Sequence, residues 1–240
     1  MQGKQHNNWV FKYAPQTLSD CIYPAEVGAY FEAAIEDAEI EHLILYGSPG
    51  VGKTTLARVL SKDLNFDFVE KNAPFEGTFE DLAQLEQYAS SVSMFGDGKI
   101  VLLDEADGLP PKSMDTFKAM LEKFAGHCSF ILTTNKIKKI PEPIRSRCLV
   151  LELGGMGNEK VDEELKDAIQ RRIFSICERE ELDQPDPNLV RAIVDLAFPD
   201  IRSSIKIAYQ VLKRKLPFKI AAASLNLKDP SVPLRSRKAA

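Results

Sequence analysis

The stretch that decides the fold runs from residue 42 to residue 64 and reads HLILYGSPGVGKTTLARVLSKDL. It opens with a short apolar run, His42–Tyr46, which has the length of a buried strand. A glycine-rich segment follows, and then apolar side chains recur at the spacing of one helix face. Those side chains are Leu56, Val59, Leu60 and Leu64. The stretch therefore predicts a strand, a tight loop and a helix in direct succession.

The loop between this strand and this helix fits the pattern G-x-x-x-x-G-K-[ST]. Its glycines let the backbone fold tightly, so that N–H groups can point into a concavity that holds phosphate oxygens. The N-terminus of the following helix adds its positive dipole end. Lys53 would reach the β- and γ-phosphates of ATP, and the hydroxyl of Thr54 would bind Mg²⁺. The predicted nucleotide contacts are Gly47, Ser48, Pro49, Gly50, Val51, Gly52, Lys53, Thr54 and Thr55.

A second apolar run, Ile100–Leu103, ends in two acidic residues, Asp104 and Glu105. Ligands of open α/β sheets bind at the carboxyl ends of the strands, so both carboxylates are expected beside the nucleotide. Asp104 is a candidate for the Mg²⁺ shell, and Glu105 is a candidate for orienting and polarising the water that attacks the γ-phosphate. A polar turn after a strand has a similar composition, but the phosphate loop earlier in the chain favours the nucleotide site. A glutamate beside the metal-binding aspartate indicates hydrolysis and not only nucleotide sensing.

Short apolar runs alternate with helical patterns as far as residue 153. Strands that alternate with helices indicate βαβ units and a mostly parallel sheet. The fold class is therefore α/β, with a five-stranded parallel sheet flanked by helices. The expected strands are His42–Tyr46, Phe66–Val69, Ile100–Leu103, Phe130–Leu132 and Leu149–Leu153.

The pattern changes at the glycine cluster Gly154–Gly157, which is typical of a linker. Beyond it the apolar spacing is helical, in three amphipathic segments. We therefore predict an α/β nucleotide-binding domain over residues 1–154 and a small helical lid domain over residues 155–227. Residues 228–240 combine charges with two prolines and are expected to form a disordered tail.

Composition narrows the classes of function. Lysine and arginine number 31 against 35 aspartates and glutamates, a formal net charge of −4, so contact with DNA would need a local basic face. The four cysteines lack Cys-x-x-Cys spacing, which argues against a zinc or redox site and fits a reducing compartment. No apolar run approaches the ~20 residues of a membrane span. We expect a soluble protein of the cytoplasm, or of the host cytoplasm if it is viral, with no membrane partner.

In the order and spacing of its motifs over residues 9–215, the sequence resembles the AAA+ clamp-loader ATPases. The fragment Asp104–Asp107 looks like the second nucleotide motif of that family. Asn135 follows an apolar strand and looks like sensor 1, a polar side chain that contacts the γ-phosphate or the attacking water. Arg147, in the fragment Ser146–Cys148, resembles the family's arginine finger, which acts on ATP bound to the neighbouring subunit.

Two further matches lie near the ends of the resembling region. Arg202 opens the third helical segment of the predicted lid and is similar to sensor 2, which would reach the γ-phosphate from the lid. Tyr13 and Pro15 resemble a family segment that lies near the adenine. The resemblance thus implies an AAA+ module followed by a helical lid.

The chain departs from the family pattern in three places. Ala14 stands where arginine is usual, which puts the adenine-side contact in doubt. The turn Asn72–Phe75 only partly matches the family's Asn-Ala-Ser-Asp turn, which lies in a region that couples DNA to the ATP site. Too few residues follow the lid for the helical collar domain that holds the ring of subunits together, so the collar is expected to be absent or the chain to be a shortened form.

The resemblance implies an ATP-binding and ATP-hydrolysing subunit of a sliding-clamp loader. Its implied partners are other loader subunits in a homo- or hetero-oligomer, a ring-shaped clamp and primer-template DNA. The segment Lys136–Arg147 has a local charge of +4, which could face a neighbour's nucleotide, DNA phosphates or water.

Two alternatives stay open. One is another DNA-remodelling AAA+ ATPase, such as a helicase loader or a junction motor, against which the fragment Ser146–Cys148 argues. The other is an ATP-binding assembly subunit that never hydrolyses, against which the intact Lys53, Glu105 and Arg202 argue.

Overall fold

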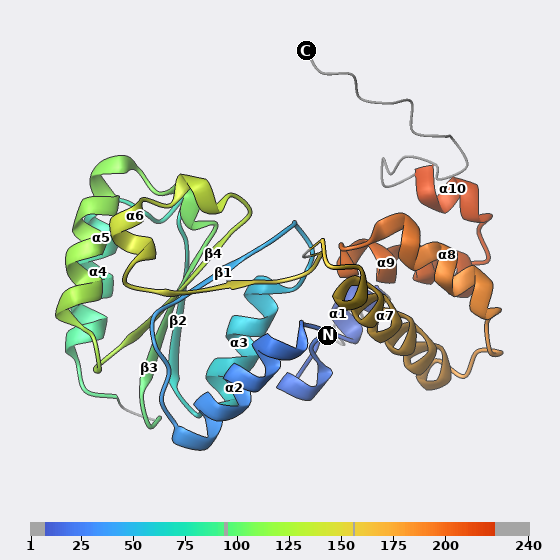
Figure 1. The fold of residues 1–240 in the computed structure, drawn as a ribbon, viewed down its shortest axis with the longest axis horizontal. Coiled ribbons are helices and arrows are strands. Elements are labelled where there is room, and N and C mark those ends of the chain that lie inside the picture. The colour runs from blue at the N-terminus through green and yellow to red at the C-terminus, as the bar shows by residue number, and fades with distance from the viewer. Residues whose placement is uncertain (1–7, 94–95, 156, 224–240) are drawn as a thin grey trace, which may run out of the picture. The chain divides into compact units, whose positions relative to one another are not determined.

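The computed structural model describes residues 8–93, 96–155 and 157–223 (Figure 1). The described chain divides into two compact units. An α/β unit comprises residues 15–155, and a helical unit comprises residues 8–14 together with residues 157–223. The predicted tail, residues 228–240, lies outside the described residues.

The α/β unit is built on a five-stranded sheet with the strand order β2-β3-β4-β1-β5. Every neighbouring pair of strands is parallel, which confirms the predicted fold class. β2 extends past the predicted end at Val69 because its polar residues pair with β3 as far as Asn72, opposite Asp104. The strands are β1 Leu43–Tyr46, β2 Asp67–Asn72, β3 Lys99–Asp104, β4 Ser129–Thr134 and β5 Leu149–Glu152.

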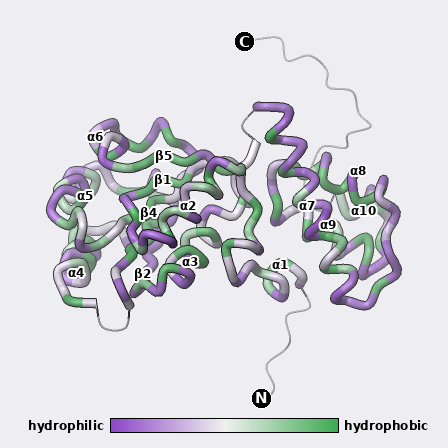
Figure 2. Tube along the Cα trace, turned by 60° about the horizontal axis from the view of Figure 1, so that its bottom comes forward, coloured by the Kyte–Doolittle hydropathy of each residue, from purple (hydrophilic) through white to green (hydrophobic). Residues whose placement is uncertain are grey.

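Helices cover both faces of this sheet because its central strands are apolar on both sides. Figure 2 shows hydrophobic residues along the central strand β1. In β3, Ile100 and Leu102 pack into one buried cluster, while Val101 and Leu103 pack into the other. The first cluster includes residues of α2 (Ala25–Asp37) and α3 (Lys53–Asp63), and the second includes residues of α4 (Phe79–Ser90) and α5 (Pro111–Lys123).

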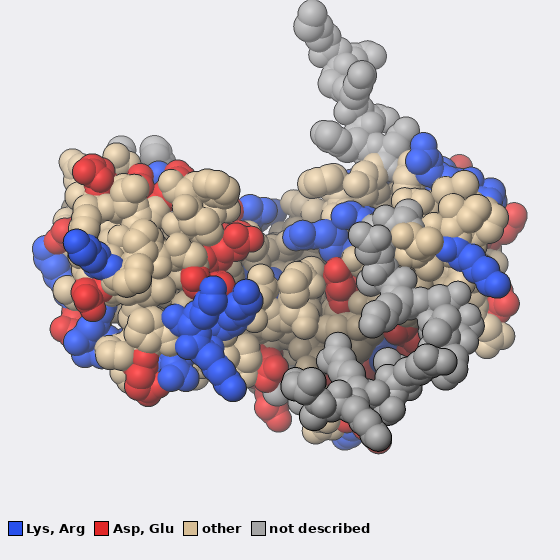
Figure 3. All heavy atoms as spheres, turned by 90° about the horizontal axis from the view of Figure 1, so that it is seen from above, with Lys and Arg blue, Asp and Glu red and all other residues tan. Residues whose placement is uncertain are grey.

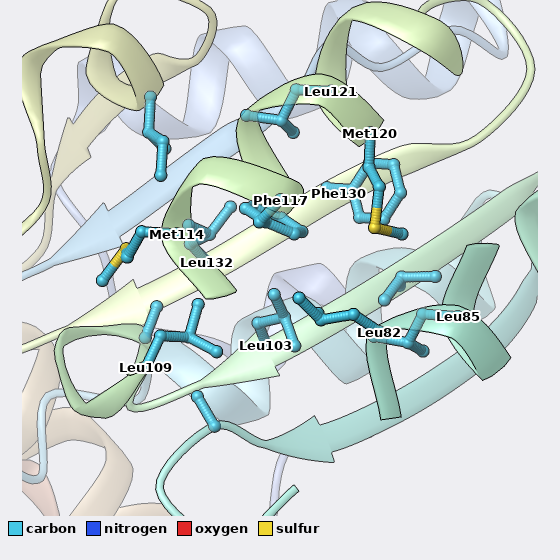
Figure 4. Close-up of a cluster of buried hydrophobic side chains, with 14 of the residues drawn as sticks. Leu82, Leu85, Leu103, Leu109, Met114, Phe117, Met120, Leu121, Phe130 and Leu132 are labelled. Carbon is cyan, nitrogen blue, oxygen red and sulfur yellow. The ribbon is translucent and has the colours of Figure 1, made fainter. Parts of the chain in front are cut away.

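Helix α5 shows how the second cluster is made (Figure 4). Phe117, Met120 and Leu121 are at most 2% exposed and lie on one side of the helix. They pack with Phe130 and Leu132 of β4. The helix begins with Pro111 at its first position, where the missing proline N–H costs nothing.

Local sequence signals set the ends of the other helices. Thr78 and Asp81 form a capping box at the start of α4, in which each side chain accepts a backbone N–H of the other residue. Helix α2 ends at Asp37, and Ala38 caps it in the left-handed conformation. The connections contain short helical turns: η1 Leu18–Asp20, η2 Ala106–Gly108, η3 Ile137–Lys139 and α6 Glu142–Arg145.

The helical unit follows the three amphipathic segments of the sequence. Asparagine or aspartate side chains cap its three main helices, at Asn158, Asp186 and Asp200. No helix within the described ranges is long and apolar enough to cross a membrane. The elements are α1 Trp9–Lys12, α7 Glu159–Arg179, α8 Pro187–Ala197, α9 Ile201–Ala208, the π-helical turn Tyr209–Lys213 and α10 Phe218–Ala223.

The placement of residues 8–14 differs from the prediction that residues 1–154 form one domain. These residues belong to the helical unit, where Trp9 is 1% exposed and its ring lies 5.6 Å from the ring of Tyr209. The hydroxyl of Tyr13 donates to Glu180 over 2.6 Å. The partners of this arm lie far along the chain, so the local pattern did not reveal them.

Candidate nucleotide-binding site

The phosphate loop joins β1 to α3 and depends on glycine at two points. Gly47 approaches the backbone after β5 so closely that a Cβ atom there would lie 2.1 Å from the carbonyl oxygen of Leu153. Gly52 is the N-cap of α3. Its φ of +99° is a backbone conformation that residues with a side chain rarely adopt. The backbone N–H of Leu56 donates to the carbonyl of Gly52 over 2.8 Å. The first N–H groups of any helix precede the start of this i→i−4 pattern, which suits a helix N-terminus to an anion.

Lys53 links the phosphate loop to the sensor 1 candidate. Its ammonium donates to the carbonyls of Gly47 and Ser48 over 2.9 Å and to Oδ1 of Asn135 over 2.8 Å. The residue is 8% exposed, so the charge is held against the loop backbone and away from bulk water. β1 and β4 are neighbours in the sheet, which brings the loop after one strand to the polar residue after the other. Two predicted site residues that are distant in sequence thus meet at hydrogen-bond distance.

Thr54 and Asp104 meet in the same way. The Thr54 hydroxyl donates to Oδ1 of Asp104 over 2.7 Å. Hydroxyl and carboxylate oxygens are ligands of the kind that Mg²⁺ prefers, usually completed by phosphate oxygens and water. No group of three or more His, Cys, Asp or Glu side chains among the described residues could enclose a metal by itself. The donor set therefore fits a magnesium ion that arrives with a nucleotide.

Glu105 has an unusual backbone. Its φ of +55° lies in the left-handed region, which costs a residue with a side chain about 1 kcal/mol. Strain of this kind persists only where surrounding contacts hold it, and it concentrates at functional sites. Here the N–H of Glu105 donates to the hydroxyl of Thr133 over 3.0 Å. The residue is exposed, so its carboxylate is accessible to water.

Two threonines of β4 take part in the candidate site; they belong to the fragment that looks like sensor 1, in which only Asn135 was given a role. The Thr133 hydroxyl accepts the N–H of Glu105 and donates to Oδ1 of Asp104, so it holds both acidic residues. Thr134 donates to Asp107 over 2.8 Å. Both threonines are 1% exposed. The sequence signal was the appearance of hydroxyl groups at the end of an apolar strand.

A hydrogen-bonded pair of a tyrosine and a glutamate at the base of the loop was also not predicted. Tyr46 ends β1 and lies opposite Glu152 of β5. Its hydroxyl donates to Oε2 of Glu152 over 2.7 Å. Burial, followed by this hydrogen bond, raises the pKa of Tyr46 to about 12. The phenol therefore stays protonated and ties together the two strand ends that flank Gly47.

Arg147 has its partners in another part of the α/β unit. Its Nε and Nη2 atoms donate to Oε1 of Glu122 in α5, and its Nη1 atom donates to the carbonyl of Pro143 and, over 3.4 Å, to the hydroxyl of Ser146. The neighbouring Cys148 is half-buried, and burial raises the pKa of its thiol to about 12. Arg147 is thus held at a different place from the cluster around Lys53 and Asp104.

The remaining predicted residues are divided between the units. Arg202 is exposed on the first turn of α9, in the helical unit. Tyr13 is buried in that unit and bonded to Glu180, whereas Pro15 belongs to the α/β unit. Their contacts with a nucleotide stay predictions.

Residues 43–153 match the family model described as the ATPase family associated with various cellular activities (AAA). The sliding-clamp-loader large subunit of Escherichia phage RB69 is 36% identical over 197 residues, which cover 81% of this chain and 61% of that protein. The replication factor C small subunit of a Methanococcus maripaludis strain is 32% identical over 206 residues, which cover 83% of this chain and 62% of that protein. The chain thus spans about three fifths of the length of these curated relatives.

Among solved structures, the Holliday junction branch migration motor RuvB of Thermotoga maritima has a similar fold. The TM-score is 0.68 at 19% identity, over 89% of this chain and 72% of that chain. At this level of identity the likeness shows a shared fold and nothing further.

Proposed function

This chain carries an AAA domain and is similar over most of its length to clamp-loader subunits; from that premise we propose that it is an ATP-hydrolysing subunit of a sliding-clamp loader. In this role it would help to open a ring clamp and place it on primer-template DNA. The observation that supports this proposal most strongly is a pair of hydrogen bonds at one edge of the sheet, from Lys53 to Asn135 and from Thr54 to Asp104.

These contacts support a proposed role for each group. The amides at the start of α3 and the ammonium of Lys53 would bind the phosphates, and Asn135 would report on the γ-phosphate through its contact with Lys53. Thr54 and Asp104 would hold Mg²⁺, which supplies charge that stabilises the phosphates during transfer. Glu105 would orient the attacking water, with its backbone fixed by Thr133.

Arg147 supports assembly with other subunits. Its hydrogen bonds tie it to α5 and α6, so the residues that converge on the phosphate loop do not include it. A guanidinium that serves hydrolysis from such a place would act on the nucleotide of a neighbour. We therefore propose that the active form is an oligomer, of this chain alone or with other subunits.

Contact with DNA would come from local groups of positively charged side chains. Both signs are interspersed over each unit on the face shown in Figure 3. Lys136, Lys138 and Lys139 are exposed in the turn after β4 and form the local basic segment that the sequence indicates. Each phosphate that such a lysine neutralises would add to the salt dependence of binding. The cytoplasm is the compartment that we propose, since all four cysteines are free thiols.

The two alternative functions, a junction motor and a subunit that binds ATP without hydrolysing it, have less support than the clamp loader. The similarity to a junction motor is one of fold, whereas the sequence similarity at 36% identity is to a clamp-loader subunit, so the loader is favoured. A subunit that binds ATP without hydrolysing it would not need an exposed glutamate held in a strained backbone beside Asp104.

The test is the rate of ATP hydrolysis with and without primer-template DNA and candidate ring clamps. A clamp-loader subunit should hydrolyse ATP faster when DNA and its clamp are both present. Stimulation by a four-way junction but not by a clamp would indicate the junction motor. Binding of ATP with no hydrolysis under any of these conditions would indicate the assembly subunit.

A further inference from the structure

The arginine proposed as the finger is held by a carboxylate for which no role has been assigned. Arg147 donates through Nε over 2.7 Å, and also through Nη2, to the same oxygen of Glu122. We propose that Glu122 is a positioning residue, which orients the guanidinium of Arg147 before a neighbouring nucleotide arrives. This inference rests on the proposed function, since it needs Arg147 to act on a nucleotide.

Glu122 and Arg147, the two residues of the ion pair, lie in or directly after helices that pack in the hydrophobic core. Glu122 follows Leu121 in α5, and Leu121 is 1% exposed against the sheet (Figure 4). On the other side, Ile144 of α6 is also 1% exposed and belongs to the same buried cluster as α5. The ion pair therefore joins two anchored elements, and its geometry is set by the core beneath it. A side chain held by such supports is oriented more accurately than one on a free loop.

The geometry of the guanidinium leaves it able to act. The group is planar and carries five N–H donors on two usable edges. Glu122 takes the edge formed by Nε and Nη2, while Nη1 donates to the carbonyl of Pro143 and, over 3.4 Å, to the hydroxyl of Ser146. The outer edge is formed by one N–H of each terminal nitrogen, and an anion that displaces the long contact to the Ser146 hydroxyl would meet it with two parallel hydrogen bonds. Glu122 thus fixes the plane of the group without using the edge that a phosphate would need.

Stability of the fold does not account for the pair. The Arg147 side chain is 31% exposed and that of Glu122 is 53% exposed. Ion pairs with this exposure contribute little to folding, because water screens them and two long side chains must be ordered. What such a pair does supply is a restricted set of arginine rotamers, which matters where a misplacement of about 1 Å can slow a reaction by two orders of magnitude.

A matched pair on the same helix provides the control. Lys123 donates to Glu86 of α4 over 2.6 Å, with side chains 59% and 40% exposed. Removing either carboxylate deletes one exposed ion pair of α5. The Glu86→Ala variant therefore reproduces the loss of charge and of an ion pair without touching Arg147.

The first measurement is the ¹⁵Nε relaxation of Arg147 in the full chain, with the signal identified by its loss in Arg147→Ala. The wild-type and Glu86→Ala proteins should show a restricted guanidinium, while Glu122→Ala should bring its order parameter below about 0.6, the flexible range. Glu122→Gln, whose amide oxygen can still accept, should lie between them. An Arg147 signal that is equally restricted in the wild-type and Glu122→Ala proteins would overturn the proposal.

The second measurement is ATP hydrolysis and ATP affinity of the assembled protein for the wild type, Glu122→Ala, Arg147→Ala and the double variant. Glu122→Ala should slow hydrolysis roughly tenfold or more with unchanged affinity, and it should cause no further loss on top of Arg147→Ala. If Arg147→Ala slows hydrolysis but Glu122→Ala behaves like Glu86→Ala, the positioning role is wrong and the proposed function stands. If Arg147→Ala itself has no effect, the finger is wrong, and the positioning role is wrong with it.

Discussion

At the scale of single residues, the roles proposed for Lys53 and Glu105 separate nucleotide binding from turnover. Lys53 is held on the phosphate loop, whereas Glu105 is exposed on a strained turn after β3. One charge would contact bound phosphate throughout the cycle, and the other would be needed only when water attacks. Substitutions of the two residues should therefore fail in different ways.

We predict that Glu105→Gln keeps ATP binding largely intact and slows turnover by at least ~100-fold, the usual contribution of a group that orients or deprotonates water. Lys53→Ala should instead weaken ATP binding, because it removes a charge-assisted contact to the phosphates. Calorimetric titration with ATP and single-turnover hydrolysis distinguish the two effects. Equal loss of binding in both variants would contradict the assignment of roles.

Thr133 gives a second prediction at this scale. Thr133→Val keeps the shape but removes the hydroxyl that accepts from the N–H of Glu105 and donates to Asp104. An unpaired polar group that stays buried costs about 1–3 kcal/mol. We expect slower hydrolysis together with a loss of stability in that range, and Thr133→Ser should restore both. Urea unfolding and hydrolysis rates test this, and a Thr133→Val protein with wild-type turnover would show that the hydroxyl does not position the site.

At the scale of elements, one carboxylate attaches the N-terminal arm to the helical unit. Glu180 follows α7, and its side chain is 8% exposed. It accepts from Lys12 of α1 and from Tyr13, both over 2.6 Å, and it pairs with Lys213 over 2.9 Å. Burial alone would raise the pKa of Glu180, but the hydrogen bonds from these three residues outweigh it and lower the pKa to about 2.

The sign of this shift predicts how the arm responds to acid. Because the pKa of Glu180 falls from 4.5 to about 2 on folding, its stabilisation is complete above pH 4.5 and is lost as the pH falls towards 2. The full contribution is on the order of 3 kcal/mol. Trp9 is the single tryptophan of the chain and packs in this unit, so its fluorescence follows unfolding. We expect Glu180→Gln to be less stable than wild type at pH 7 and the difference to shrink below pH 4.5.

The comparison of Glu180→Gln with the wild type also controls for the titration of other groups. Other carboxylates of the unit also titrate in acid, but they are common to both proteins and cancel in the difference. A difference in unfolding free energy that is the same at pH 7 and at pH 3 would mean that Glu180 is not the titrating group.

At the scale of the whole molecule, the proposed finger requires a second subunit. Arg147→Ala should barely change ATP affinity of the isolated chain and should cut hydrolysis in the assembly by ~10³-fold or more. Mixing Arg147→Ala with Glu105→Gln should restore part of the activity, because some interfaces then join an intact Glu105 to a neighbour's intact Arg147. Hydrolysis rates of the mixture, alongside sizing of the mixed oligomer, provide the test. Mixed oligomers that form without regaining activity would rule out action across an interface.

The amino-acid sequence alone determined the α/β fold and the centre of the candidate site. These features depend on patterns within short windows: the glycines and Lys53 of one loop, the apolar strands, and the acids that end β3. A parallel sheet necessarily brings the ends of neighbouring strands to one edge, so the meeting of Lys53 with Asn135 follows from strand order as much as from the side chains.

Only the tertiary structure decided which distant side chains pair. Tyr13 and Glu180 are 167 residues apart in sequence, and nothing local to either residue indicates the other. Glu122 looks like an ordinary exposed helix residue until α6 places Arg147 beside it. Such pairs are selected by the packing of the core, which brings particular surfaces together, and a sequence window carries the period of an element but not the identity of the surface that it will face.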